Sequence, residues 1–151
     1  VVIHPQSIVH SLVEFNDGSI LAHLGVTDMR FPILFALTWP ERVESAMERL
    51  DLTTLKELSF AAPDFTDFPC LGLAVEAARM GGTAPAILNA ANESAVEAFR
   101  QGRLGFLEIS DIVREVLDAV PAVAEISLER VLDADRRARE AAGKRITARG
   151  A

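Results

Sequence analysis

The sequence predicts an α+β protein in which a β-hairpin and a short helix precede a C-terminal four-helix bundle. Two observations lead to this prediction. Up to about residue 40, β-branched and apolar residues form short runs that suit strands. From residue 70 onward, apolar residues recur every three or four positions, which is the period of amphipathic helices. We therefore expect residues 1–40 to end an α/β domain, 41–69 to be a linker and 70–151 to form the bundle.

The hairpin is predicted by two apolar runs, 8–15 and 20–24, that flank Asn16-Asp17-Gly18-Ser19. An Asp-Gly pair favours a type I′ turn, in which both central residues have positive φ. The register that follows pairs Phe15 with Ile20, Val13 with Ala22, Leu12 with His23 and His10 with Gly25. The first strand is apolar on both sides, which is typical of a strand inside a sheet that is covered on both faces.

After the hairpin, residues 25–30 read as a loop, and Pro32 suits the first turn of a short helix that ends before Trp39-Pro40. Residues 41–69 read as a connector with a possible short strand, Leu55–Phe60.

Four helical segments are predicted beyond Pro69. Their core stripes are expected to be Leu71, Val75 and Ala78; then Leu88, Ala91, Ala95 and Phe99; then Ile109, Ile112, Val113, Val116, Leu117 and Val120; and finally Leu128, Val131, Leu132 and Asp135 onward through alanines. Gly81-Gly82 and Pro121 end the first and third helices, and Ser127 is the expected N-cap of the fourth. Short connections favour an up-and-down bundle that could fold alone.

Composition limits the partners. The formal net charge of the 151 residues is -7 without a compensating basic cluster, which argues against nucleic-acid and anionic-membrane surfaces. No apolar run approaches transmembrane length. One cysteine, Cys70, cannot form an internal disulfide, so we expect a soluble, cytoplasmic chain in which Cys70 is a small buried hydrophobe.

Three histidines, His4, His10 and His23, raise the possibility of a metal site. No cysteine or suitably spaced carboxylate joins them, so a metal site built from this chain is the weaker interpretation. His10 facing Gly25 has two interpretations. It forms a pocket wall with the Asp28-Met29-Arg30 loop, or it is a hydrogen-bonded core histidine beside a surface ion pair; spacing alone favours the second.

A second polar group, Asn89, Asn92 and Glu93, shares one side of a predicted helix. Asparagine is unfavourable in mid-helix, so the group is expected to line a buried polar network or a binding site, and the structural role is favoured. No nucleophile with a base within reach, G-x-G-x-x-G, P-loop or H-E-x-x-H motif occurs.

The motifs "IHPQSIVHS", "EFNDGS", "DMRFPI" with "WPER", "AAPDFTDFPC" and "LNAANE" occur in an order and spacing that resemble the 1-deoxy-D-xylulose 5-phosphate reductoisomerase family of the non-mevalonate isoprenoid pathway. The resemblance covers essentially the whole chain, but only the C-terminal part of those enzymes. It implies the end of an α/β catalytic domain, a linker and a four-helix bundle. It also implies a homodimer formed through the catalytic domain, with NADPH and Mg²⁺ or Mn²⁺ as cofactors.

On this resemblance, His10 matches a histidine near the active site that is important for activity. Met29 matches a methionine that lines the nicotinamide and substrate pocket, although Thr27 stands where the family often has proline. The glycine-rich NADPH motif, the acidic metal ligands and the phosphate loop have no matching positions here. We therefore expect no metal ligand from this chain, no cofactor bound to it alone and no activity by itself.

The reaction implied by the resemblance is the rearrangement of 1-deoxy-D-xylulose 5-phosphate and its reduction by NADPH to 2-C-methyl-D-erythritol 4-phosphate. The alternative is a stand-alone helical interaction module whose hairpin pairs with a partner strand. A reading frame that continues upstream of Val1 into a glycine-rich βαβ unit would favour the enzyme.

Overall fold

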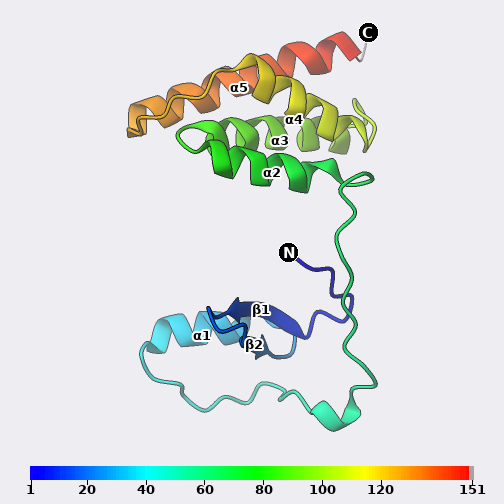
Figure 1. Cartoon of the computed structure of the whole chain (residues 1–151), viewed down its shortest axis with the longest axis vertical. Coiled ribbons are helices and arrows are strands. Elements are labelled where there is room, and N and C mark those ends of the chain that lie inside the picture. Colours follow the sequence, from blue (N-terminus) through cyan, green and yellow to red (C-terminus); the bar gives the residue numbers. More distant parts are fainter. Residues whose placement is uncertain (150–151) are drawn as a thin grey trace. The chain divides into compact units, whose positions relative to one another are not determined.

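The computed structural model describes residues 1–149, in two compact units, Val1–Pro63 and one that begins at Asp64 (Figure 1). The first contains strands β1 (Val9–Glu14) and β2 (Ile20–Leu24), helix α1 (Arg30–Thr38) and the 3-10 helix η1 (Leu52–Thr54). The second contains helices α2 (Pro69–Met80), α3 (Ala84–Arg100), α4 (Glu108–Ala119) and α5 (Leu128–Arg149). The order predicted from the sequence, a hairpin and short helix followed by a helical region, is confirmed.

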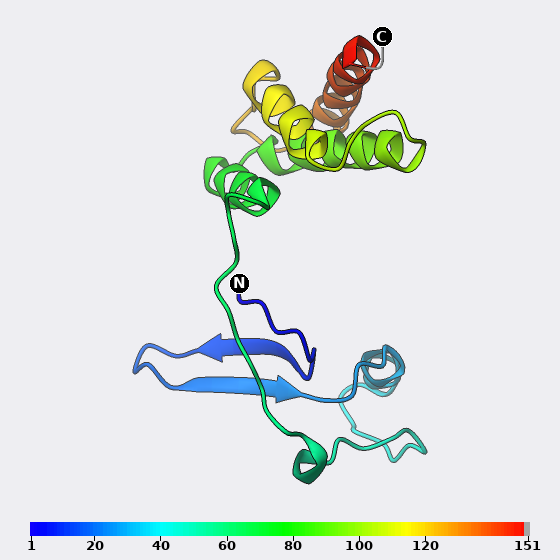
Figure 2. The same ribbon diagram turned by 90° about the vertical axis from the view of Figure 1, so that its right-hand side faces the viewer.

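The hairpin forms, but the predicted type I′ turn and its register are wrong. Figure 2 shows β1 and β2 running antiparallel beside each other, and the pairs are Glu14 with Ile20, Val13 with Leu21, Leu12 with Ala22 and Ser11 with His23. Only Gly18 in this turn has positive φ, at 84°. The Gly18 N–H donates to the Phe15 carbonyl and the Phe15 N–H to the Ser19 carbonyl, so the loop has three residues. A type I turn followed by a left-handed glycine gives this geometry.

The register changes again at His10. Val9 pairs with Leu24 and Ser11 with His23, so His10 is an extra residue in β1, a β-bulge. The Gly25 N–H donates to the Ile8 carbonyl at 3.0 Å on the far side of the bulge. The bulge shifts the register by one residue further from the prediction, so Gly25 lies opposite Ile8 and not opposite His10. The His10 ring still lies beside Gly25, as expected from the sequence.

The rest of the first unit consists of α1, η1 and segments without regular secondary structure. Helix α1 ends at Thr38, directly before Trp39-Pro40, as predicted. The expected strand Leu55–Phe60 is absent from the described residues; an isolated bridge between Ile3 and Ala61 is the pairing in this region. Within residues 1–63 no side chain is fully buried, since two strands and one short helix cannot enclose a core.

Helix α3 lies at the centre of the second unit and contacts α2, α4 and α5. The predicted α4 stripe is confirmed, because Ile109, Ile112, Val113, Val116 and Val120 are all buried. Ser127 is also confirmed at the start of α5, where its Oγ accepts from the Arg130 N–H at 3.3 Å.

The other stripes were only partly predicted. On α2 the buried residues are Leu73 and Ala77, not Val75 and Ala78. On α3 Ala91 and Ala95 are buried but Phe99 is 41% exposed, and on α5 Leu128 and Leu132 are exposed. The face of α5 that is buried consists of Ala134, Ala138, Ala142 and Ile146. Alanine on both α3 and α5 lets the two backbones approach closely, so the larger apolar side chains remain outside.

A pair of hydrogen bonds joins the α2–α3 turn to the α4–α5 loop. The Thr83 N–H donates to the Val123 carbonyl at 3.0 Å, and the Val123 N–H donates to Thr83 Oγ1 at 2.9 Å. Thr83 is fully buried, so both of its bonds are shielded from water. These bonds fix the two connections at this end of the helical unit.

Candidate functional site

The bulge in β1 determines where His10 lies. His10 Cε1 is 3.7 Å from the position that a Cβ on Gly25 would occupy, so the imidazole contacts the start of the loop that precedes α1. A residue in a bulge is displaced from the regular alternation of the strand, and bulges often direct a side chain toward a site. The sequence-based expectation that His10 stands beside Gly25 is therefore met by a different backbone geometry.

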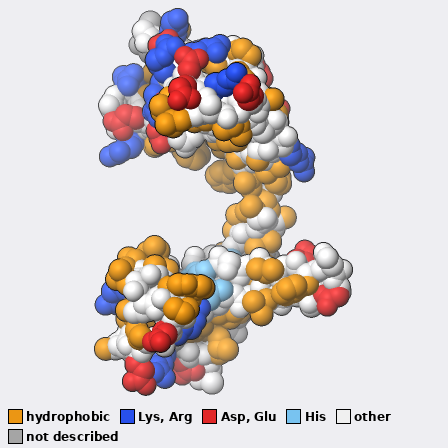
Figure 3. Space-filling view, turned by 90° about the vertical axis from the view of Figure 1, so that its left-hand side faces the viewer, with side chains coloured by type: hydrophobic (Ala, Val, Ile, Leu, Met, Phe, Trp, Pro, Cys, Tyr) orange, Lys and Arg blue, Asp and Glu red, His pale blue; other side chains and the backbone are white. Residues whose placement is uncertain are grey.

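His10 also lines a hollow in the first unit. Its lining residues come from the N-terminal segment, β1 and the connector: Val1, Val2, His4, Val9, His10, Ser11, Leu12 and Phe60. The rings of His10 and His23 have centroids 5.7 Å apart. His10 is exposed among the described residues. Figure 3 shows histidine side chains at the surface of this unit beside exposed hydrophobic side chains.

Met29 and its neighbours lie at the start of α1. The Asp28 carboxylate accepts the Arg30 N–H at 2.9 Å and the guanidinium Nε at 2.8 Å. The hydrogen bond from the Arg30 side chain lowers the pKa of Asp28 most, and the bond from the Arg30 backbone N–H lowers it further. The surface ion pair predicted here is confirmed. Met29 is 72% exposed and is not among the residues that line the hollow with His10.

His4 was considered from the sequence only as a metal ligand, and both of its ring nitrogens have protein partners. Nδ1 lies 2.8 Å from the Ser59 carbonyl, and Nε2 accepts the Ile8 N–H at 3.1 Å. Within residues 1–149 no three His, Cys, Asp or Glu side chains gather as metal ligands do. The described residues do not by themselves form a magnesium or manganese site. No helix among the described residues is long and apolar enough to cross a membrane.

In the polar group on α3, Asn89 and Glu93 are exposed and Asn92 is half-buried. Asn89 Nδ2 donates to Glu93 Oε1 at 3.2 Å, and Arg139 of α5 donates to Glu93 Oε2 at 2.7 Å. Arg139 also donates to Asp135 at 2.8 Å. Hydrogen bonds from Arg139 and Asn89 lower the pKa of Glu93. The group links α3 to α5 across the surface, which agrees with the favoured structural role.

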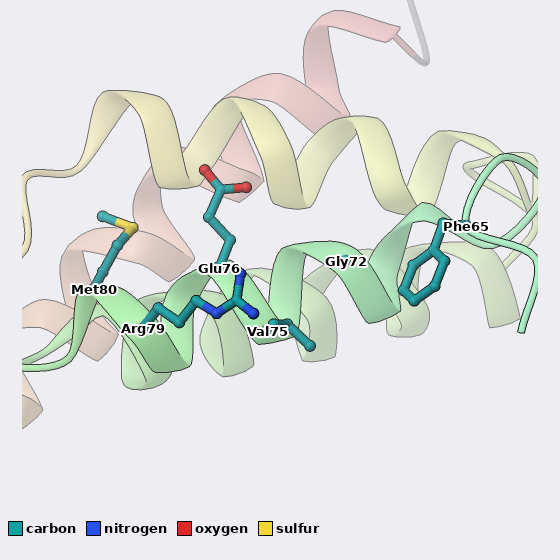
Figure 4. Close-up of a pocket in the computed structure, with 6 residues that line it drawn as sticks. All are labelled: Phe65, Gly72, Val75, Glu76, Arg79 and Met80. Carbon is teal, nitrogen blue, oxygen red and sulfur yellow. The ribbon is translucent and has the colours of Figure 1, made fainter. Parts of the chain in front are cut away.

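A shallow groove runs along α2 (Figure 4) and is lined by Phe65, Gly72, Val75, Glu76, Arg79 and Met80. The Glu76 side chain reaches toward α4, where Arg114 donates to it at 3.1 Å. Cys70 begins the same helix and packs partly against the core. Burial raises the pKa of its thiol, which fits a small hydrophobe and not a nucleophile.

The described chain thus combines a hairpin and a short helix, with a hollow lined by His10, and a helical unit that has a core of its own. The chain belongs to the family of the DXP reductoisomerase C-terminal domain, whose family model matches residues 24–141.

Individual relatives agree. The chain is 57% identical to the 1-deoxy-D-xylulose 5-phosphate reductoisomerase of Stutzerimonas stutzeri over 95% of this chain and 36% of that protein. It is 54% identical to that of Cupriavidus taiwanensis over 100% of this chain and 38% of the relative. A solved structure of the Zymomonas mobilis reductoisomerase in complex with NADPH matches with a TM-score of 0.89 and 48% identity, over 96% of this chain and 38% of that one. Another reductoisomerase structure, in complex with NADPH, fosmidomycin and magnesium, matches with a TM-score of 0.88 and 46% identity, over 97% of this chain and 38% of that one. The chain thus spans somewhat over a third of the length of these relatives.

Proposed function

We propose that this chain is the C-terminal part of an NADPH-dependent 1-deoxy-D-xylulose 5-phosphate reductoisomerase, which isomerises and reduces its substrate to 2-C-methyl-D-erythritol 4-phosphate. The observation that supports this most strongly is the match to reductoisomerases across nearly the whole chain, at about half of its positions. The comparisons do not favour the alternative of a stand-alone interaction module.

Within that enzyme, His10 and Met29 contribute walls to the pocket for substrate and nicotinamide. His10 projects from the bulge beside Gly25 and lines the hollow, which supports this role. Met29 is exposed on the following loop and is available to a partner surface. When bound, NADPH supplies the hydride and the divalent metal polarises the substrate oxygens. We expect the metal ligands and the nucleotide site in other parts of the enzyme, because the motifs that carry them have no matching positions in this sequence, and we expect no cofactor to bind this chain alone.

We further infer that residues 1–40 end the catalytic domain, 41–69 form the linker and 70–151 form its four-helix bundle. The apolar side chains on both faces of the hairpin are exposed here, and the rest of the enzyme covers them. The full enzyme is a cytoplasmic homodimer joined through the catalytic domain, with no nucleic-acid or membrane partner. The net charge of -7 argues against nucleic-acid and anionic-membrane partners, and the single cysteine fits a reducing compartment.

The test is His10→Gln in the full-length enzyme, followed by substrate-dependent NADPH oxidation. We expect kcat/KM to fall about tenfold or more, because a displaced or missing pocket wall misplaces the substrate. His23→Gln is the matched control, since His23 is exposed on the same hairpin but does not line the hollow, and it should stay within about threefold of wild type. Wild-type kinetics for His10→Gln would refute the pocket role. Absence of activity in the unaltered full-length enzyme would refute the proposed function.

A further inference from the structure

The imidazole of His4 joins two backbone segments that are far apart in the sequence. The Ile8 N–H points at Nε2, so that nitrogen is the acceptor and carries no proton. In a neutral ring the proton is then on Nδ1, which donates to the Ser59 carbonyl at 2.8 Å. The two contacts together select one tautomer of neutral His4.

The segment around Ser59 is held in place by neighbours of His4. Gln6 Nε2 donates to Ser59 Oγ at 2.7 Å, and the Ile3 N–H donates to the Ala61 carbonyl at 2.8 Å, with the reverse bond at 3.0 Å. The His4 ring stacks on Phe60, with centroids 4.6 Å apart and planes inclined by 16°. These contacts fix the His4 ring against residues 59–61.

On its other side, His4 reaches the residues that position the candidate site. Ile8 donates its N–H to His4 and accepts the Gly25 N–H at 3.0 Å with its carbonyl. Ser7, just before it, has φ of 51°, a left-handed conformation that serine rarely adopts. Thr27 Oγ1 donates to the Ser7 carbonyl at 3.0 Å, so the loop that carries Met29 is tied to the same turn.

We propose that His4 is a positioning residue of the candidate site: neutral and protonated on Nδ1, it ties Ser59 to the Ile8 amide. In this way it holds the left-handed Ser7 turn and the start of the strand from which His10 projects. The expected effect of His4 on catalysis rests on the proposed function. The tautomer itself rests only on the hydrogen bonds of this chain.

The first experiment needs no activity. Nitrogen-15 NMR of the chain, labelled at histidine, distinguishes a protonated from an unprotonated ring nitrogen, and His4→Phe assigns the signals of His4. We expect a neutral ring with the proton on Nδ1, and an Ile8 amide that exchanges slowly with solvent in wild type and faster in His4→Phe. A proton on Nε2, an equal mixture of tautomers, or an Ile8 amide unaffected by His4→Phe would overturn the proposal.

The second experiment measures kcat and KM in the full-length enzyme. His4→Phe retains an aromatic ring for stacking but loses both hydrogen bonds. In His4→Gln, the amide oxygen can occupy the place of Nε2 and accept the Ile8 N–H. In His4→Asn, the amide nitrogen can occupy the place of Nδ1 and donate to the Ser59 carbonyl, but the bond to Ile8 is lost. We expect His4→Gln to keep kcat within about threefold of wild type, and His4→Phe and His4→Asn to lower it about tenfold or more.

Equal losses in all three variants would show a structural role alone and would overturn the positioning role. Wild-type kinetics in His4→Phe would overturn it as well. Failure of the unaltered enzyme to turn over would instead refute the proposed function, and the NMR result would still decide the His4 tautomer.

Discussion

Gly82 is the position where one added carbon should damage the helical unit most. A Cβ there would lie 2.1 Å from the Val123 carbonyl oxygen and 2.9 Å from both Val123 C and Ala124 Cα. Its φ of 55° is also left-handed, which disfavours any L side chain. The substitution Gly82→Ala therefore introduces backbone strain and a clash with backbone atoms that cannot rotate away.

The magnitude follows from the two effects. The left-handed conformation costs alanine about 1–2 kcal/mol. To relieve the clash, the Val123 loop must retreat from 2.1 Å to at least 3.0 Å, which stretches the two Thr83–Val123 hydrogen bonds of 3.0 and 2.9 Å. Each lost bond costs about 1 kcal/mol or more, because its partner stays buried. The free energy of unfolding should fall by about 3–4 kcal/mol, the sum of these contributions.

Gly102→Ala is the matched control. Gly102 also has a left-handed φ, 71°, but its added Cβ would meet nothing within 4 Å, so it should cost only about 1–2 kcal/mol. The entropy that alanine removes from the unfolded chain is the same in both variants and cancels. Urea unfolding of the chain, followed by far-UV circular dichroism, gives both values. If Gly82→Ala destabilises no more than Gly102→Ala, the contact with the Val123 loop has no energetic weight and the reasoning fails.

Two further changes should act on the same helical unit. Gly143→Ala, in the middle of α5 with nothing within 4 Å of the added Cβ, should raise the free energy of unfolding by about 0.5–1 kcal/mol in the same assay; a loss of stability would contradict this. The pKa of Glu93 is lowered in the folded chain, so its carboxylate stabilises the fold at pH values above its ordinary pKa, and this contribution is lost as the pH falls through the lowered pKa. Arg139→Met should raise the pKa of Glu93 in a carboxyl NMR titration, and an unchanged titration would show that the ion pair does not form in solution.

The helix boundaries and the α4 stripe could be predicted because they depend on local signals. In α4, large β-branched and aliphatic residues occupy only one stripe, so a single face can be buried. The hairpin was equally visible, since Gly18 between two apolar runs requires a turn. The turn type could not be predicted, because a left-handed glycine occurs in both two-residue and three-residue loops. In the structure, the Asp17 carboxylate stabilises the three-residue loop by accepting the Ser19 N–H at 2.8 Å.

The candidate site was only partly predictable for a related reason. Counting residues on a regular ladder placed His10 opposite Gly25, but the three-residue loop and the bulge each shift the register by one residue, and Gly25 lies opposite Ile8. The contact between His10 and Gly25 is made by the His10 ring, which the count could not place. His4 gave no sign of its role, since its partner Ser59 is 55 residues away and a single long-range contact leaves no periodic signal.

Local spacing in the sequence thus determined where the elements begin and end, which residues cap or terminate them, and which family the motifs resemble. Packing decided the rest. On α5 both an alanine stripe and a leucine stripe have helical spacing, and the close approach of α3 buries Ala134, Ala138 and Ala142 while Leu128 and Leu132 stay outside. Which stripe is buried depends on the packing energy between helices and not on the sequence of one helix, so it can be decided only when the helices are packed together.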